Sequence, residues 1–174
     1  MIRNSNRRGV GLAALVLWAL AVLAPAMRPA LAGEIVGRPE VIDGDTLYFS
    51  GRIVRLYGID APELEQSCRA AGRTWPCGKE ARWAAINRIH PHWVTCVEKG
   101  RAPDRAILAV CYLAGIGQHD LNAWLVREGW ALAERGAAPG YAEHEAAARA
   151  AGKGLWRGQF VAPGDWRQGK RLAP

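Results

Sequence analysis

A succession of short β-type segments joined by tight turns most constrains the fold of this 174-residue chain. Residues 34–42, 46–49 and 53–59 have the β-branched and aromatic side chains that are typical of strands. Turn sequences at residues 43–45 (D-G-D) and 50–52 (S-G-R) separate the three segments. We therefore expect three successive short strands near the start of the folded part.

Helical and strand patterns follow in the rest of the chain. We expect helices at residues 78–90, 120–129 and 139–151, each ended by a Pro or Gly. A strand pair is expected at residues 93–98 and 107–113. Five short strands with inserted helices fit a mainly β, α+β fold, a five-stranded Greek-key barrel of the OB type with three packed helices. Element order alone is also compatible with other α+β layouts.

The first 32 residues have the pattern of a secretory signal peptide. Three arginines, at positions 3, 7 and 8, precede an uncharged run over residues 10–23, and Ala30-Leu31-Ala32 forms a small-residue cleavage site. The alternative is an uncleaved membrane anchor, but this run is shorter than the ~20 residues that a spanning helix needs. We expect a cleaved signal, a secreted or periplasmic protein and no stable membrane insertion.

The predicted organisation has three parts. Residues 1–32 form the signal peptide, residues 33–160 one domain, and residues 161–174 a basic C-terminal tail that we expect to be solvated. Within the domain, residues 64–77 contain Gly and Pro and are expected to form a loop.

The net charge of the chain is much smaller without the predicted signal peptide. The full sequence has a formal net charge of +7, which suggests an anionic partner. Four arginines belong to residues 1–32, and without them 19 basic and 16 acidic residues leave a net charge of +3. The case for a nucleic-acid substrate therefore depends on a local site.

Four cysteines follow the predicted signal peptide, and an even number in an oxidising compartment indicates disulfides. No C-x-x-C pair is present, so zinc-ribbon and thioredoxin-like sites are not expected. Three pairings can be drawn. We favour Cys68–Cys77, which closes a short loop, and Cys96–Cys111, which would join two neighbouring strands.

Two pairs of carboxylates stand at the ends of expected strands. Asp43 and Asp45 lie in the first turn, where a plain D-G hairpin turn is the simple alternative, and Asp60 and Glu63 follow the third strand. If that strand returns beside the first one, the four carboxylates converge, and they would repel one another unless a cation binds. Oxygen donors alone favour Ca²⁺ or Mg²⁺ over zinc.

Arg55 lies within the third expected strand, among apolar side chains. An unpaired guanidinium in such a place is costly, so it is expected either in a structural salt bridge or as a phosphate clamp. Its planar fork suits the second role. A hard cation, a spare carboxylate and an arginine together are the components of phosphodiester hydrolysis.

The order of several motifs resembles that of the secreted thermonuclease, or staphylococcal-nuclease-like, family. The most specific are V-I-D-G-D-T at residues 41–46 and R-L-Y-G-I-D-A-P-E at residues 55–63. The resemblance extends over about residues 34–156 and implies an OB-type barrel with three helices, in agreement with the element order. Shorter similar stretches are at residues 78–81, 109–111, 120–129 and 154–158.

The resemblance also implies a cofactor. Asp45 and Asp60 would hold Ca²⁺, and Ala61 would give a backbone carbonyl. Asp43 would be a neighbouring carboxylate that supports these ligands. Mg²⁺ is the alternative cation. The chain would then act, as a monomer, on DNA or RNA with little sequence specificity.

The same resemblance assigns the reacting groups. Glu63 would act on the attacking water and Arg55 would hold the phosphate. In the family a second phosphate-binding arginine usually precedes the A-V-C strand. Counting back from that strand without a gap places Ala106 there, beside Arg105.

Arg105 would replace the missing arginine only through a bulge or a shift around Pro103, because neighbouring strand residues face opposite sides. The aromatic residues usual after the second helix are reduced to Tyr141, which is the expected substrate contact. These departures motivate an alternative: a catalytically weak or inactive OB-fold module that binds nucleic acid or another partner in the cell envelope.

Overall fold

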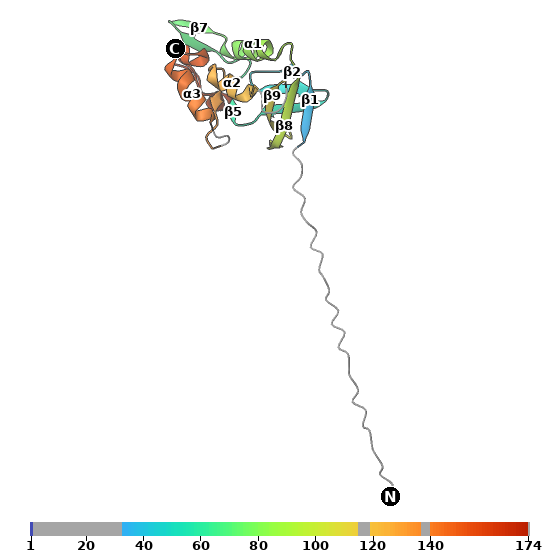
Figure 1. Ribbon diagram of the computed structural model, residues 1–174. Coiled ribbons are helices and arrows are strands. Elements are labelled where there is room, and N and C mark those ends of the chain that lie inside the picture. Colours follow the sequence, from blue (N-terminus) through green and yellow to red (C-terminus); the bar gives the residue numbers. More distant parts are fainter. Residues whose placement is uncertain (2–32, 115–118, 137–139, 174) are drawn as a thin grey trace. The chain divides into compact units, whose positions relative to one another are not determined.

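The computed structural model describes Met1 and residues 33–114, 119–136 and 140–173 (Figure 1). The signal peptide predicted for residues 1–32 therefore lies, apart from Met1, outside the described residues. The strands are β1 (Glu34–Gly37), β2 (Glu40–Val41), β3 (Thr46–Phe49), β4 (Arg52–Leu56), β5 (Ile59–Asp60), β6 (Cys68–Ala70), β7 (Arg73–Trp75), β8 (Val94–Arg101), β9 (Ile107–Leu113) and β10 (Leu132–Ala133). The helices are α1 (Cys77–Ile89), α2 (Leu121–Arg127), α3 (Tyr141–Ala150), the 3₁₀ helix η1 (Gly154–Arg157) and α4 (Pro163–Arg167).

Six strands form one curled sheet in the order β1-β8-β9-β4-β3-β2. All pairs are antiparallel except β4 with β9, which is parallel. β1 and β2 lie at opposite edges of the sheet although only residues 38 and 39 separate them in the chain. The sheet must therefore curl until its edges approach each other. Together with the packed helices, this confirms the predicted OB-type α+β fold.

Apolar side chains that alternate along the strands form the main core. In β3, Leu47 and Phe49 are buried whereas Tyr48 is exposed. Helix α1 adds Ala85 and Ile89, four residues apart and therefore on one face of the helix, to the same core. Helices α2 and α3 lie side by side in Figure 1.

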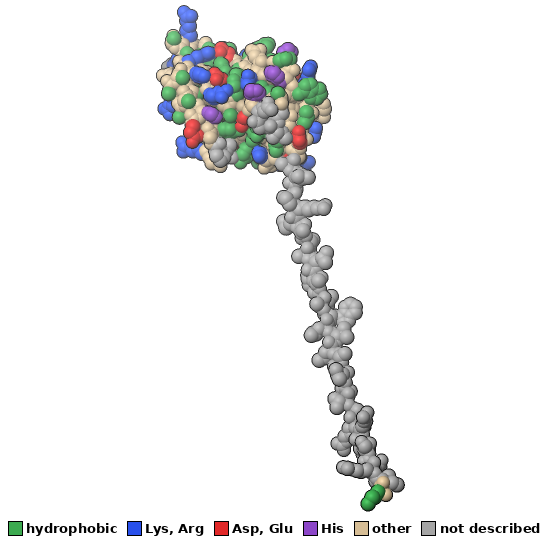
Figure 2. Space-filling view, in the orientation of Figure 1, with side chains coloured by type: hydrophobic (Ala, Val, Ile, Leu, Met, Phe, Trp, Pro, Cys, Tyr) green, Lys and Arg blue, Asp and Glu red, His purple; other side chains and the backbone are tan. Residues whose placement is uncertain are grey.

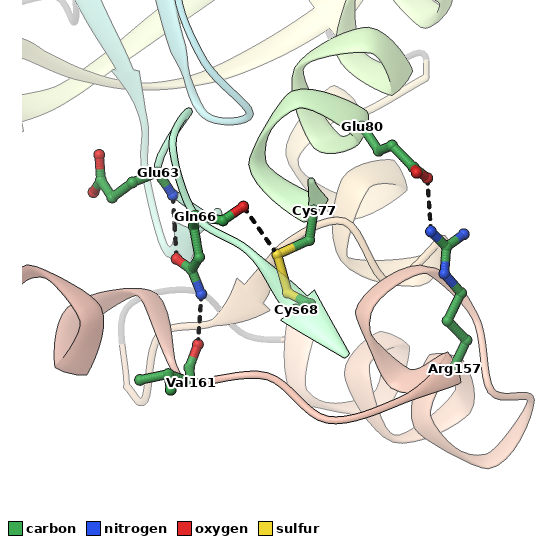
Figure 3. Close-up of a disulfide and its surroundings, with 7 residues drawn as sticks. All are labelled: Glu63, Gln66, Cys68, Cys77, Glu80, Arg157 and Val161. Atoms are coloured by element: carbon green, nitrogen blue, oxygen red, sulfur yellow. Dashed lines mark hydrogen bonds and ion pairs between the residues drawn. A yellow bond between two sulfur atoms is a disulfide. The ribbon is translucent and has the colours of Figure 1, made fainter. Parts of the chain in front are cut away.

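Both favoured disulfide pairings are present. Cys96 on β8 and Cys111 on β9 are opposite each other in the sheet register, with Cα atoms 4.0 Å apart. Cys68–Cys77 joins strand β6 to the first residue of α1 (Figure 3). Both of these cysteines are buried with Leu155 in a second, small core.

The expected loop at residues 64–77 contains a hairpin, β6–β7. Each strand has only three residues, too few for a two-residue period to be recognised in the sequence. Backbone bonds between Arg69 and Gln159 attach the hairpin to the segment after η1. That partner is 90 residues away in the chain, so local patterns carry no sign of it.

The expected solvated tail at residues 161–174 is partly structured. Helix α4 begins at Pro163, and proline is favoured at the first helical position. The side-chain amide of Gln66 donates to the Val161 carbonyl at 2.7 Å, which fastens this segment to the loop after β5 (Figure 3). The prediction of a tail depended on the Pro, Gly and basic residues of this segment, and the structure shows that some of its basic side chains have partners within the fold.

Lys and Arg side chains are interspersed with Asp and Glu on the face drawn in Figure 2. This face has no patch of a single charge sign, which fits the small net charge calculated without the signal peptide. Within the described ranges, no helix is both long and apolar enough to span a membrane.

Candidate active site

The two carboxylate pairs and Arg55 converge on one cavity of about 390 Å³. The turn before β3 supplies one pair, the end of β5 and the following loop supply the other, and Arg55 comes from β4. The charged residues that line the cavity are Asp43, Asp45, Arg55, Asp60, Glu63, Arg101, Glu134 and Arg167.

Asp45 joins the two acidic turns directly. Its Oδ2 accepts a hydrogen bond from the backbone N–H of Ala61 at 2.7 Å, and its Oδ1 accepts one from the Thr46 hydroxyl at 3.0 Å. Asp43 in turn accepts from the backbone N–H of Asp45 at 3.0 Å. A Cβ at Gly44 would lie 2.7 Å from the Ala61 Cβ, so this close approach of the turns requires glycine.

The carboxyl group of Asp45 is in an unfavourable environment for a negative charge. It is buried, and burial raises its pKa to about 8, with the nearby charges of Asp43 and Asp60 acting in the same direction. The hydrogen bonds from Ala61 and Thr46 oppose the shift but do not cancel it. A cation beside Asp45 would offset the electrostatic cost of its negative charge.

Asp60 and Glu63 are both paired with Arg167 from helix α4. Its guanidinium donates to Asp60 Oδ1 at 2.9 Å, to Asp60 Oδ2 at 3.1 Å and to Glu63 Oε1 at 2.7 Å. The sequence interpretation missed Arg167, because we assigned residues 161–174 to a solvated tail. The Pro-Gly-Asp-Trp-Arg segment, with its helix-starting proline, was the available signal.

Arg55 is in a salt bridge, the structural alternative that the sequence left open. Its Nη2 donates to Asp104 Oδ2 at 2.9 Å, and this hydrogen bond holds the pKa of Asp104 below its usual range. Both side chains are well exposed, and solvent screens such pairs, so they contribute little to stability. Arg55 is therefore available to an incoming phosphate at small cost.

Arg105 does not line this cavity. It is exposed, has a backbone φ of 68° in the turn between β8 and β9, and lines a neighbouring depression with Arg52 and Ile53. The arginine of this hairpin that lines the cavity is Arg101, whose Nε donates to Glu98 Oε1 at 2.8 Å. The sequence could not show this, because β8 continues beyond Glu98 through an irregularity in the register.

Tyr141 is also placed away from the cavity. It is buried, and its hydroxyl donates to Asp120 Oδ2 at 3.0 Å. The residue that the segment after α2 brings to the cavity is Glu134, whose backbone N–H donates to the Gly58 carbonyl at 2.9 Å. Burial and the nearby charge of Asp60 raise the pKa of Glu134.

The donor chemistry of the cavity fits a hard divalent cation. Its anionic side chains are all carboxylates, and the crowding around Asp45 favours a cation there. In the part of the chain that the structure describes, no group of three or more His, Cys, Asp or Glu side chains is already arranged to hold a metal ion. The oxygens of Asp60 in particular are occupied by α4.

Comparisons with known proteins agree with the fold. Residues 53–158 match the family described as Staphylococcal nuclease homologue, a range that contains Arg55, Asp60 and Glu63. The succinoglycan biosynthesis protein ExoI of Rhizobium meliloti (strain 1021) is 34% identical over 131 residues, which is 74% of this chain and 68% of ExoI. The chain therefore belongs to the family of staphylococcal nuclease homologues.

Proposed function

We propose that the protein is an exported Ca²⁺-dependent nuclease that hydrolyses phosphodiester bonds of DNA or RNA with little sequence specificity. The observation that carries the proposal is the convergence of Asp45, Asp60, Glu63 and Arg55 on one cavity, in a chain of this family. Hydrolysis needs a group that neutralises the phosphate and a base that activates water. The cavity contains candidates for both.

Glu63 is the proposed general base. Its side chain is 38% exposed, so water can reach it, and it lies near Asp60 because both bind Arg167. Glu63 would take a proton from water as the water oxygen attacks phosphorus. The bond from phosphorus to the leaving oxygen breaks, and that oxygen takes up a proton.

Arg55 is the proposed phosphate-binding residue, released from Asp104 when substrate enters. A fork of N–H groups placed where charge develops on the phosphate stabilises the transition state. Arg101 lines the same cavity and is a candidate for the second guanidinium, in place of Arg105.

Asp45, Asp60 and the Ala61 carbonyl would hold Ca²⁺. Asp43 would support Asp45 by accepting a hydrogen bond from the Asp45 backbone N–H. When bound, the cation would supply charge neutralisation at the phosphate, and Mg²⁺ is the alternative hard cation. The carboxylate side chains themselves would bind and orient it.

Export follows, in this proposal, from the predicted signal peptide and the two disulfides. Disulfides persist in secreted and periplasmic proteins, where the environment is oxidising. We propose that the released protein acts as a monomer on nucleic acid outside the cytoplasm.

The test is cleavage of single-stranded DNA and RNA by the purified, oxidised protein with Ca²⁺, with Mg²⁺ and with a chelator. We expect cleavage with Ca²⁺ that stops on chelation. Asp45→Asn, purified in the same way, serves as the control for a contaminating nuclease and should be inactive. Cleavage that survives the chelator would contradict the proposal.

A second candidate is an OB-fold module that binds nucleic acid or another cell-envelope partner with little catalysis. The internal pairing of the site favours it, since Arg55 is bound to Asp104, and both Asp60 and Glu63 to Arg167. ExoI is likewise named for succinoglycan biosynthesis. This candidate predicts metal-independent binding and no cleavage at any Ca²⁺ or Mg²⁺ concentration.

A further inference from the structure

Helix α4 binds both carboxyl oxygens of Asp60. The guanidinium of Arg167 donates to Oδ1 at 2.9 Å and to Oδ2 at 3.1 Å, and the backbone N–H of Gly164 donates to Oδ2 at 3.1 Å. Arg167 also donates to Glu63 Oε1 at 2.7 Å. One short helix thus engages a proposed metal ligand and the proposed general base together.

This contact is stronger than a common surface ion pair. The arginine fork binds one carboxylate through two nitrogens and reaches a second one, an arrangement with both geometric and electrostatic complementarity. The Asp60 side chain is only 19% exposed.

We propose that Arg167 is a built-in competitor of the divalent cation: it holds Asp60 in the metal-free protein and leaves it when the cation binds. This inference rests on the proposed Ca²⁺ site. A carboxylate has about four lone-pair positions, and α4 already uses three of those on Asp60. A cation at Asp60 would also face the positive charge of the guanidinium.

Linkage makes the effect reciprocal. If docking of α4 weakens Ca²⁺ binding, then Ca²⁺ binding must weaken the docking of α4 by the same factor. The chain before α4 stays attached through the Gln66 bond to the Val161 carbonyl, so the movement concerns the residues after Val161. The amide of Gly164 reports on it directly, because its partner is Asp60.

The test is calorimetric titration of the metal-free, oxidised protein with Ca²⁺ alone. We expect Arg167→Gln to bind Ca²⁺ about tenfold more tightly than the wild type, within the range typical of coupled sites. The matched control is Arg171→Gln, which removes the same charge from the same segment. Arg171 donates to the backbone carbonyls of Trp166 and Lys170, and its variant should keep the wild-type affinity.

Hydrogen exchange supplies a second readout in the wild type. The Gly164 amide should exchange faster at saturating Ca²⁺ than without it, and an unchanged rate would contradict the release of α4. If Arg167→Gln fails to fold, Arg167→Lys takes its place, because lysine keeps the charge but cannot make the two-nitrogen contact. It should bind Ca²⁺ more tightly than the wild type.

The two proposals fail in different ways. Equal or weaker Ca²⁺ binding by the Arg167 variant, with the wild type still binding, would overturn the competition and leave the Ca²⁺ site standing. Absence of Ca²⁺ binding in the wild type and in both glutamine variants would overturn the Ca²⁺ site itself, and the competition with it.

Discussion

The acidic and the basic residues of the cavity reach it in different ways. Asp43 and Asp45 lie in the turn before β3 and Asp60 ends β5, and the hydrogen bond from the Ala61 N–H to Asp45 at 2.7 Å joins the two places directly. Arg101 comes from the far end of β8, and Arg167 comes from α4. The three aspartates are therefore placed by local turn geometry, whereas Arg101, Arg167 and the acidic Glu134 are brought to the cavity by packing between distant segments.

This difference explains which positions tolerate change. A substitution in an acidic turn disturbs neighbours that hold one another in place. On the basic side, Arg101 lines the cavity, although the residue count from the sequence placed the expected clamp position at Ala106. We expect single substitutions to reduce cleavage more on the acidic side than on the basic side.

The largest expected effect is that of Glu63→Gln on cleavage. Removing a general base typically costs 10²–10⁴-fold in rate, so we expect kcat to fall by about that factor with Ca²⁺ saturating. Glu65→Gln, at the exposed carboxylate two residues along, is the matched control and should retain activity. A Glu63→Gln variant with full activity would remove Glu63 from the mechanism.

The arginines test the basic side. Arg55→Gln should lower kcat/KM by about 10²–10³-fold, the usual loss for one preorganised charge donor. Arg105→Gln should leave cleavage unchanged, because Arg105 lines a different depression. Arg101→Gln should lower kcat/KM by less than Arg55→Gln but by more than Arg105→Gln. A loss at Arg105 as large as that at Arg55 would mean that the hairpin rearranges when substrate binds.

Removal of the Cys68–Cys77 disulfide tests whether this bond stabilises the fold next to the loop after β5. The double Cys→Ala variant should lose ~2–4 kcal/mol of unfolding free energy, measured by urea denaturation. The bond lies beside Gln66, whose carbonyl is within 3.4 Å of the Cys77 sulfur and whose amide holds Val161 (Figure 3). Unchanged stability would contradict a structural role for this disulfide.

The smallest effect concerns Asp45 without metal. Asp45→Asn should raise the melting temperature in the presence of a chelator, by the equivalent of ~1 kcal/mol, because it removes a buried carboxyl group crowded by Asp43 and Asp60. Asparagine can still accept from Ala61 and donate to Thr46. The melting temperature of Asp43→Asn, which changes the other carboxylate of the turn, is measured for comparison. A lower melting temperature for Asp45→Asn would show that the carboxylate stabilises the turn.

The sequence was sufficient to predict the elements built from local patterns. The strands around residues 43–45 alternate apolar side chains, and the D-G-D turn with its glycine gives the close approach to Ala61. The carboxylates converge because β4 returns beside β3, and not beside the first expected strand as the prediction supposed. Both disulfide pairings were also favoured from spacing along the chain.

What the sequence did not predict depends on distant partners. Strand β8 continues past a register irregularity between Glu98 and Gly100 to Arg101, which lines the cavity, and no residue count from Cys111 reveals this irregularity. Hairpin β6–β7 is attached to Gln159, and α4 is held by Asp60. The sequence of a basic segment does not show whether its side chains are solvated or bound to carboxylates of the same chain.

The most direct measurement is anomalous diffraction from crystals of the protein grown with Ca²⁺. The account predicts one Ca²⁺ in the cavity, within about 2.3–2.6 Å of carboxylate oxygens from both Asp45 and Asp60, with Arg167 withdrawn from Asp60. A saturating Ca²⁺ concentration that leaves this position empty, with Arg167 still bound to Asp60, would contradict it.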